Sequence, residues 1–226
     1  MIPLKDNVPT RTFPIITITI VLVNTLVFLW SLTLADGLGR HLVHTYALIP
    51  KELLVAVTVR PDLLPYNILT IFTSMFLHGG ILHIGGNMLY LWIFGNNVED
   101  AVGHFRFILF YLLSGVVAAL VQCSIDPGSS VPMIGASGAV SGILGAYLLL
   151  YPRARVKTLI FIFVFITTVD IPAMVLLSLW FFVQVIFSHG QGVAWFAHIG
   201  GFLFGLITIK IFTRGMRPRP RPRPAW

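Results

Sequence analysis

The sequence predicts an all-α, polytopic membrane protein with a bundle of six transmembrane helices. Hydrophobic residues make up 57% of the 226 residues and charged residues only 10%, with a mean hydropathy of +0.90. Because soluble domains carry about 25% charged residues, the chain has no room for a large soluble domain. The apolar residues fall into six long runs, and the basic residues are divided unequally between the two ends of those runs.

The first three spans lie in the first half of the chain. We expect them at residues 15–34, 81–96 and 105–123. A cleavable signal peptide is the alternative for the first run, but that run is too long and its cleavage signal is weak. The long connection between the first two spans holds an apolar piece, residues 68–77, that is too short to cross a bilayer. We expect this piece to lie in or dip into the outer leaflet.

The fourth and sixth spans are expected at residues 137–151 and 193–212. The fifth is less regular, because a short apolar run is interrupted by Asp170-Ile171-Pro172. Asp170 suits a helix N-cap and Pro172 the first helical turn, which places the fifth span at 171–188. The alternative is one long helix with Asp170 buried in the membrane.

Basic residues set the expected orientation, since six spans place both termini on one side. Twelve Lys and Arg residues fall on that side and three, namely Arg40, Lys51 and Arg60, on the other. The positive-inside rule then puts both termini in the cytoplasm. We expect a cytoplasmic segment at 1–14, a membrane domain at 15–213 and a basic Arg-Pro tail at 214–226. The net charge of +7 follows this topology, so the expected partner is the lipid bilayer and not nucleic acid.

Four polar residues are expected at one depth in the membrane. Ser137 begins the fourth span and His198 lies about five residues into the sixth, and both spans run inward. Both side chains should therefore lie roughly 7–8 Å below the outer boundary. His83 and Asn87 lie near the outer start of the second span and, four residues apart, on one face. An ionisable residue inside the membrane predicts a functional site.

The residue types indicate nucleophilic catalysis. Ser137 at a helix start lies beside free backbone N–H groups and the positive end of the helix dipole, which stabilise an oxyanion. His198 can remove the Ser137 proton and later protonate a leaving amine. Asn87 and His83 offer further donors to the oxyanion. No carboxylate is expected at this depth, so a Ser–His dyad is favoured over a triad.

Glycines flank both candidate catalytic residues. Gly138 and Gly142 are four apart on the fourth span, as Gly201 and Gly205 are on the sixth, and Gly135 precedes the serine. Small residues at this spacing allow membrane helices to touch backbone to backbone, which would bring Ser137 and His198 together. The alternative is helix packing without catalysis.

Taken together, these motifs resemble the rhomboid family of intramembrane serine proteases. The matching stretches are His83-Ile-Gly-Gly-Asn87, Gly135-Ala-Ser137-Gly138 and Ala197-His198-Ile-Gly-Gly201-Phe-Leu-Phe-Gly205. The resemblance covers residues 15–212. It implies a rhomboid-like six-helix bundle, Ser137 as nucleophile, His198 as base and an oxyanion site from Asn87 and His83. It also implies hydrolysis of peptide bonds in or near the transmembrane segments of single-span membrane proteins.

The chain departs from the family at Ser141, where some members place a tyrosine that stacks on the catalytic histidine. Trp195 or Phe196 is expected to support the His198 ring instead. We expect a serine endopeptidase without cofactor or metal, because a His-Glu-x-x-His motif is absent from the sequence. The fifth span is the expected lateral gate, and residues 188–193 the expected lid.

Two other function classes compete with the protease. One is a catalytically silent rhomboid-like protein that binds membrane helices; loss of the serine or histidine would mark it, and neither is lost. The other is a transporter, which would suggest internal repeats that are not visible here. The expected location is a bacterial or archaeal cell membrane.

Overall fold

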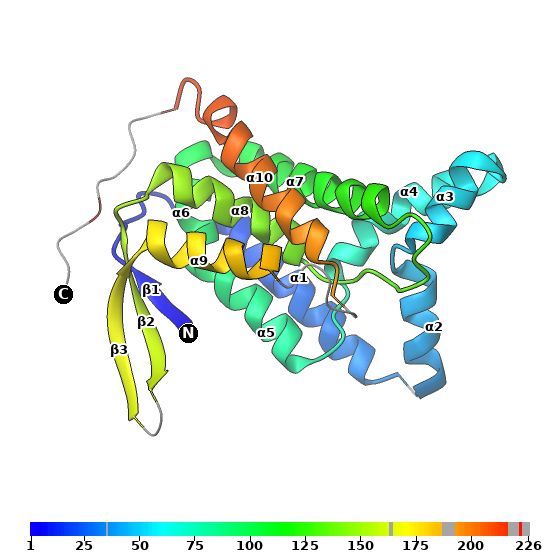
Figure 1. Cartoon of the computed structure of the whole chain (residues 1–226), viewed down its shortest axis with the longest axis horizontal. Helices are drawn as coiled ribbons and strands as arrows, with labels where there is room; N and C mark the ends of the chain where they lie inside the picture. Colours follow the sequence, from blue (N-terminus) through cyan, green and yellow to red (C-terminus); the bar gives the residue numbers. More distant parts are fainter. Residues whose placement is uncertain (35, 163–164, 187–192, 217–221, 223–226) are drawn as a thin grey trace.

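The computed structural model describes residues 1–34, 36–162, 165–186, 193–216 and 222. Most of these residues are helical, and the longer helices run roughly side by side (Figure 1). Three helices are long and apolar enough to cross a membrane: α1 (Ile15–Leu32), α7 (His104–Ile125) and α10 (Trp195–Phe212). A helix pair bent by 84°, Pro61–Phe76 with Ile81–Val102, is a fourth candidate. A mostly helical membrane protein is therefore confirmed.

The second predicted span is longer than expected. It comprises α5 (Ile81–Tyr90), the π-helical η3 (Leu91–Gly95) and α6 (Asn96–Val102), which follow one another without a break. The preceding connection holds α2 (Asp36–Tyr46), α3 (Pro50–Thr58), the 3₁₀ turns η1 (Pro61–Leu63) and η2 (Ser74–Phe76), and α4 (Leu64–Thr73). The short apolar piece is thus α4 with η2, and the sharp bend follows it at Gly79 and Gly80.

The segment between α8 (Ser137–Leu150) and α9 (Ala173–Ile186) corrects the prediction of an all-α fold. It forms the strands β2 (Arg155–Ile162) and β3 (Phe165–Pro172), which join β1 (Ile2–Asp6) in an antiparallel sheet of order β1-β2-β3. Asp170 pairs with Lys157 inside this sheet, so its prediction as a helix N-cap is wrong. The strands form because the segment is rich in β-branched and aromatic residues and β1 supplies a pairing edge.

Two carboxylates at the end of the second span hold the start of α1. Glu99 is fully buried and accepts the backbone N–H groups of Ile16 at 2.9 Å and Thr17 at 2.8 Å. Asp100 accepts the backbone N–H of Arg11 at 3.0 Å. The bonds to Glu99 satisfy donors at the start of α1 that have no partner within the helix, and the bond to Asp100 holds the segment before α1.

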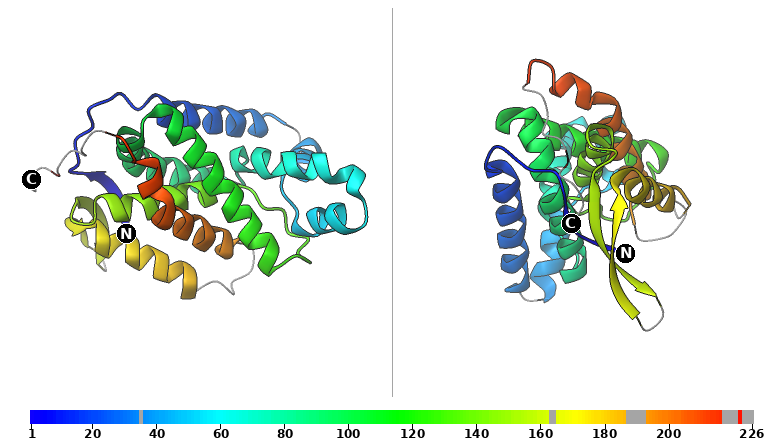
Figure 2. Two further views of the ribbon diagram at one scale, coloured as in Figure 1. Left: turned by 90° about the horizontal axis from the view of Figure 1, so that it is seen from above. Right: turned by 90° about the vertical axis from the view of Figure 1, so that its left-hand side faces the viewer.

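Glycines bring α8 and α10 into backbone contact. A Cβ atom at Gly201 would lie 2.1 Å from the carbonyl oxygen of Gly138, and one at Gly205 would lie 1.9 Å from that of Gly142. Neither position can hold a larger residue unless the helices separate. Figure 2 shows the resulting arrangement, with α10 lying against α7 and α8.

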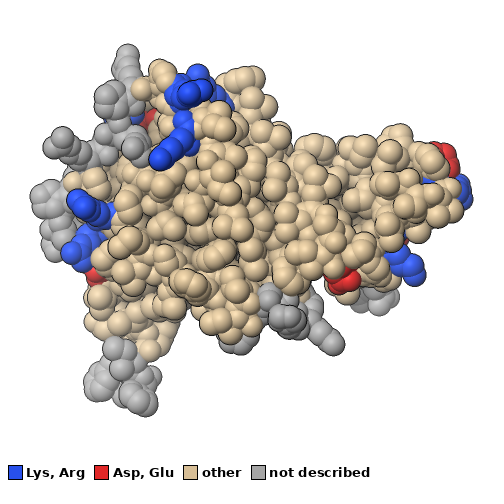
Figure 3. Space-filling model, turned by 45° about the horizontal axis from the view of Figure 1, so that its top comes forward, with Lys and Arg blue, Asp and Glu red and all other residues tan. Residues whose placement is uncertain are grey.

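Charged residues gather toward the two ends of the molecule on the face shown in Figure 3, and uncharged residues cover the belt between them. This distribution is the one that a bilayer requires, because charged side chains are costly in hydrocarbon. The remaining apolar helices, α8 and α9, have only 14 residues each.

Candidate active site

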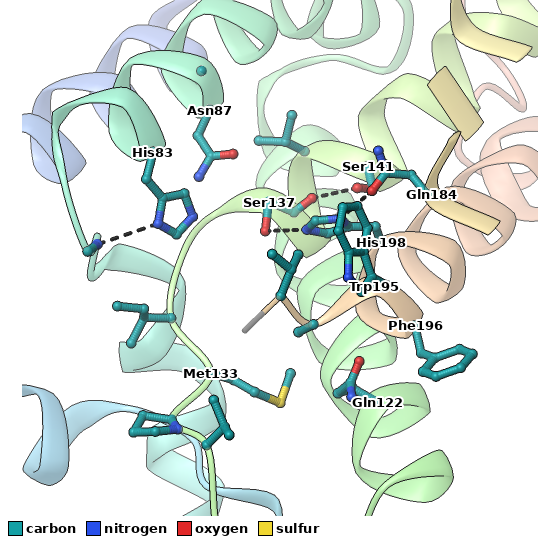
Figure 4. Close-up of a pocket in the computed structure, with 18 of the residues that line it drawn as sticks. His83, Asn87, Gln122, Met133, Ser137, Ser141, Gln184, Trp195, Phe196 and His198 are labelled. Carbon is teal, nitrogen blue, oxygen red and sulfur yellow. Dashed lines mark hydrogen bonds between the residues drawn. The ribbon is translucent and has the colours of Figure 1, made fainter. Parts of the chain in front are cut away.

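The four residues expected to carry the chemistry line one cavity of about 1210 Å³. Its walls come mainly from α5, α8, α9, α10 and the segment before α8, and Gln122 of α7 also lines it. Ser137 and His198 lie on one side of it, and His83 and Asn87 face them from α5 (Figure 4). The cavity therefore brings together His83 and His198, which are 115 positions apart in the chain.

The serine and histidine are in hydrogen-bond contact. Ser137 Oγ lies 2.8 Å from Nε2 of His198. Ser137 is the first residue of α8, where backbone N–H groups have no partner within the helix. His198 lies in the first turn of α10. The glycine contacts between these two helices hold the two side chains at this distance.

An amide holds the other side of the imidazole ring. Nδ1 of His198 lies 2.8 Å from Oε1 of Gln184, a residue of α9 that is only 7% exposed. Because an amide oxygen can only accept, Nδ1 carries the proton and Nε2 is left to accept from Ser137. The sequence analysis missed Gln184, although a lone amide within the apolar run of the fifth span was a signal that could have found it.

Two tryptophans flank the same ring. The ring centroid of Trp180 lies 6.2 Å from that of His198, and Trp195 lies edge-on to it at 6.1 Å. Phe196, the other expected support, points away from the histidine (Figure 4). Ser141, at the family's tyrosine position, donates to the carbonyl oxygen of Ser137 at 2.6 Å. The ring is thus supported from α9 and from its own helix.

The opposite wall of the cavity carries His83 and Asn87, and both contact the buried His78. Asn87 Nδ2 donates to Nε2 of His78 at 3.0 Å, and His78 is itself buried. The ring of His83 meets that of His78 edge-on at 5.0 Å, and its Nδ1 accepts the backbone N–H of Gly79 at 3.4 Å. An amide nitrogen carries two hydrogens, so Asn87 can donate to His78 and to a second acceptor in the cavity.

Gly135 forms a turn before α8 and does not lie in a contact between helices. Its φ of 117° lies in a region that favours glycine, and its N–H donates to the carbonyl oxygen of Ser74 at 2.9 Å. A Cβ atom here would lie 2.6 Å from Nε2 of His83. Gly135 therefore lets the chain turn into α8 and lets the His83 ring approach.

In the described part of the chain, no group of three His, Cys, Asp or Glu residues is placed to hold an ion. The described cavity wall includes one carboxylate, the exposed Asp126. The arrangement can transfer a proton from a serine to a histidine and can donate hydrogen bonds from the facing wall.

The sequence matches the Rhomboid domain family over residues 65–215. The chain belongs to the rhomboid family. The matched range includes all three rhomboid-like motifs and the whole cavity wall contributed by α5, α8, α9 and α10. The sheet strand β1 and the helix α1 lie before it.

Similar proteins include mitochondrial rhomboid proteins and a bacterial rhomboid protease. The mouse presenilin-associated rhomboid-like protein, mitochondrial, is 31% identical over 143 residues, which cover 59% of this chain and 35% of that protein. The Bacillus subtilis rhomboid protease GluP is 41% identical over 78 residues, covering 34% and 15%. The yeast rhomboid protein 1, mitochondrial, is 32% identical over 97 residues, covering 41% and 28%.

The chain spans about a third or less of the length of these rhomboid relatives. Family and helices together identify an integral membrane protein. Because mitochondrial proteins are prominent among the relatives, the comparisons do not support the bacterial or archaeal cell membrane expected from the sequence.

Proposed function

We propose that this protein is an intramembrane serine endopeptidase that hydrolyses peptide bonds in or near the transmembrane segments of membrane proteins. The observation that carries the proposal is the 2.8 Å contact between Ser137 Oγ and His198 Nε2. That contact lies at the starts of two helices joined by glycines, in a chain of the rhomboid family, and one relative is named a rhomboid protease.

The first half of the reaction forms an acyl-enzyme. Ser137 Oγ attacks the carbonyl carbon of the scissile bond while its proton passes to Nε2 of His198. The carbonyl oxygen becomes an oxyanion, which accepts hydrogen bonds from the Ser137 N–H, Asn87 and His83. His198 then gives the proton to the leaving nitrogen, and the C–N bond breaks.

The second half releases the acyl group. A water molecule takes the place of the leaving amine and gives a proton to His198 as its oxygen attacks the ester carbon. The proton returns to Ser137 Oγ as the C–O bond breaks. Gln184 supports both halves, because its bond to Nδ1 fixes the ring in the tautomer that accepts protons at Nε2.

We propose a rhomboid-like bundle of six membrane helices for residues 15–213: α1, the α5–α6 span, α7, α8, α9 and α10. α8 and α9 are short but apolar. The segment 1–14 and the tail 214–226 would lie in the cytoplasm, as the basic residues favour. Residues 217–221 and 223–226 of the tail lie outside the described residues.

The test is cleavage of single-span membrane proteins by the purified protein in liposomes, with the cut site mapped. Ser137→Ala and His198→Ala should each abolish cleavage, because nucleophile and base act as a unit. Thermal unfolding of both variants would verify that they fold. Cleavage that persists in either folded variant would refute the assignment. Wild-type protein that binds the substrates without cutting them would instead identify a catalytically silent helix-binding protein.

A further inference from the structure

The hairpin β2–β3 carries apolar side chains that nothing in the described structure covers. Phe161 and Ile166 pair directly across the two strands and are 57% and 66% exposed. The residues from 159 to 166 are all apolar in the sequence. We call the described apolar residues of this part of the hairpin, Leu159, Ile160, Phe161 and Ile166, the apolar tip. A two-stranded ribbon with an apolar end is a poor structure in water, since exposed apolar strands promote aggregation.

The base of the hairpin is anchored in the protein. Val156 and Thr158 are fully buried, and β1 pairs along the outer side of β2. From this base the hairpin runs across the axes of α8 and α9, at the level of the ends of those helices (Figure 1). Seen from that end, it projects past the outline of the helices (Figure 2). The apolar tip therefore lies where the surface of a bilayer around the helices would be.

The surfaces beside the hairpin are suited to a lipid interface. Val169 of β3 is 42% exposed, and the exposed apolar residues Met174, Val175 and Leu179 continue from it along α9. Arg153 and Arg155, at the base of the hairpin, are both exposed. Cations above an apolar surface match anionic headgroups above acyl chains.

We propose that the apolar tip is embedded in the membrane surface on the side of β1, beside α9. The occupant of this surface is lipid, because the tip continues the apolar face of a membrane helix and is bordered by arginines. The outer edge of β3 has no partner strand in the described sheet. Open sheet edges are not tolerated in hydrocarbon, so the backbone of the hairpin lies among headgroups while its side chains reach the acyl chains.

An environment-sensitive fluorophore on single cysteines tests this inference independently of any protease activity. Cys123 is the chain's one cysteine and would first be replaced by alanine. Phe161→Cys and Ile166→Cys carry the probe at the apolar tip. Ile207→Cys, 73% exposed on α10, is the lipid reference, and Ser130→Cys, exposed in the segment before α8, is the water reference.

The labelled variants would be reconstituted one copy per nanodisc, in bilayers containing anionic lipid. We expect blue-shifted emission at both tip positions. Lipid-borne quenchers should reduce this emission to nearly the same extent as they reduce that of the Ile207 reference. Emission and iodide quenching like those of Ser130 at both positions would show a tip in water and overturn the proposal. Blue-shifted emission without lipid quenching would show a tip buried against protein and would overturn it as well.

Discussion

Nδ1 of His198 lies 2.8 Å from Oε1 of Gln184, so the candidate base on α10 is oriented by an amide on α9. Together with Trp180 and Trp195, this contact supports the ring in a chain that has Ser141 where some rhomboids place a stacking tyrosine. It also links two roles, because α9 is the helix expected to move when a substrate enters from the side. Movement of α9 that carries Gln184 away from His198 would release the imidazole ring of the base.

The Gln184 contact predicts a graded effect on catalysis. Gln184→Leu should lower kcat roughly fivefold, since a neutral hydrogen bond contributes about 1 kcal/mol. Gln184→Glu keeps an acceptor for Nδ1–H and should retain more of the rate than Gln184→Leu. The measurement is kcat and KM on a membrane substrate. Equal losses in both variants would show that Gln184 acts only through packing.

Asn87 is predicted to stabilise the oxyanion. Its side chain faces Ser137 across the cavity and has a second N–H beyond the one given to His78. Asn87→Ala should lower kcat by about 100-fold or more while KM changes little. Thermal unfolding serves as the control. A variant with a lower melting temperature but an unchanged kcat would make Asn87 a packing residue.

Glycine contacts are predicted to be essential to the fold. Gly205→Ala would place a Cβ atom 1.9 Å from a carbonyl oxygen of α8, and overpacking of this kind destabilises by about 1–3 kcal/mol. Gly85→Ala is the matched control, because a Cβ atom there meets nothing within 4 Å. Thermal unfolding in detergent should show a lower melting temperature for Gly205→Ala only. Equal melting temperatures would contradict the close contact of α8 and α10.

The half-buried Asp6 at the end of β1 predicts a pH dependence of stability. Burial raises the pKa of Asp6 from 3.8 to about 6, although hydrogen bonds from Tyr147 and Asn97 oppose the shift. Between these values the folded protein holds a proton that the unfolded chain releases. The free energy of unfolding therefore falls as the pH rises from about 4 to about 6, by roughly 3 kcal/mol from this group.

Asp6→Asn should remove that part of the pH dependence, because an amide does not titrate. The measurement is the unfolding midpoint of wild type and variant between pH 4 and pH 7. Asp126→Asn, at an exposed carboxylate, should keep the wild-type slope. If the unfolding midpoint of Asp6→Asn changed with pH just as that of the wild type does, burial would not raise the pKa of Asp6.

Much of the fold follows from the sequence. Long apolar runs separated by polar residues or glycines form helices in lipid, because a helix satisfies its backbone hydrogen bonds internally. The helices α7, α8 and α10 begin and end within two residues of the predicted spans. The hairpin was missed because apolar content alone does not separate a short helix from a strand. Gln184 was missed because its role depends on how α9 is rotated about its own axis. The spacing of residues along one helix does not predict that rotation.

The expected lid, residues 188–193, lies outside the described residues except for Val193. The expected gate, α9, is described up to Ile186. Stacked aromatic rings join it to α10 at Phe202: the Phe181 ring lies 4.7 Å from that of Phe202, at 26°. An aromatic pair contributes about 0.5–1.5 kcal/mol, so this contact can open far more readily than the backbone contact of α8 and α10.

Phe181→Ala should therefore loosen α9 and raise kcat/KM for membrane-embedded substrates several-fold, while a soluble peptide that needs no lateral opening is cut at the wild-type rate. Phe182→Ala is the matched control, since Phe182 is 60% exposed and its loss should leave both rates unchanged. The comparison also separates the two roles of α9. If Phe181→Ala lowers the cleavage of both substrates equally, α9 serves mainly to hold Gln184 against His198, and substrates must reach Ser137 by a path that leaves α9 in place.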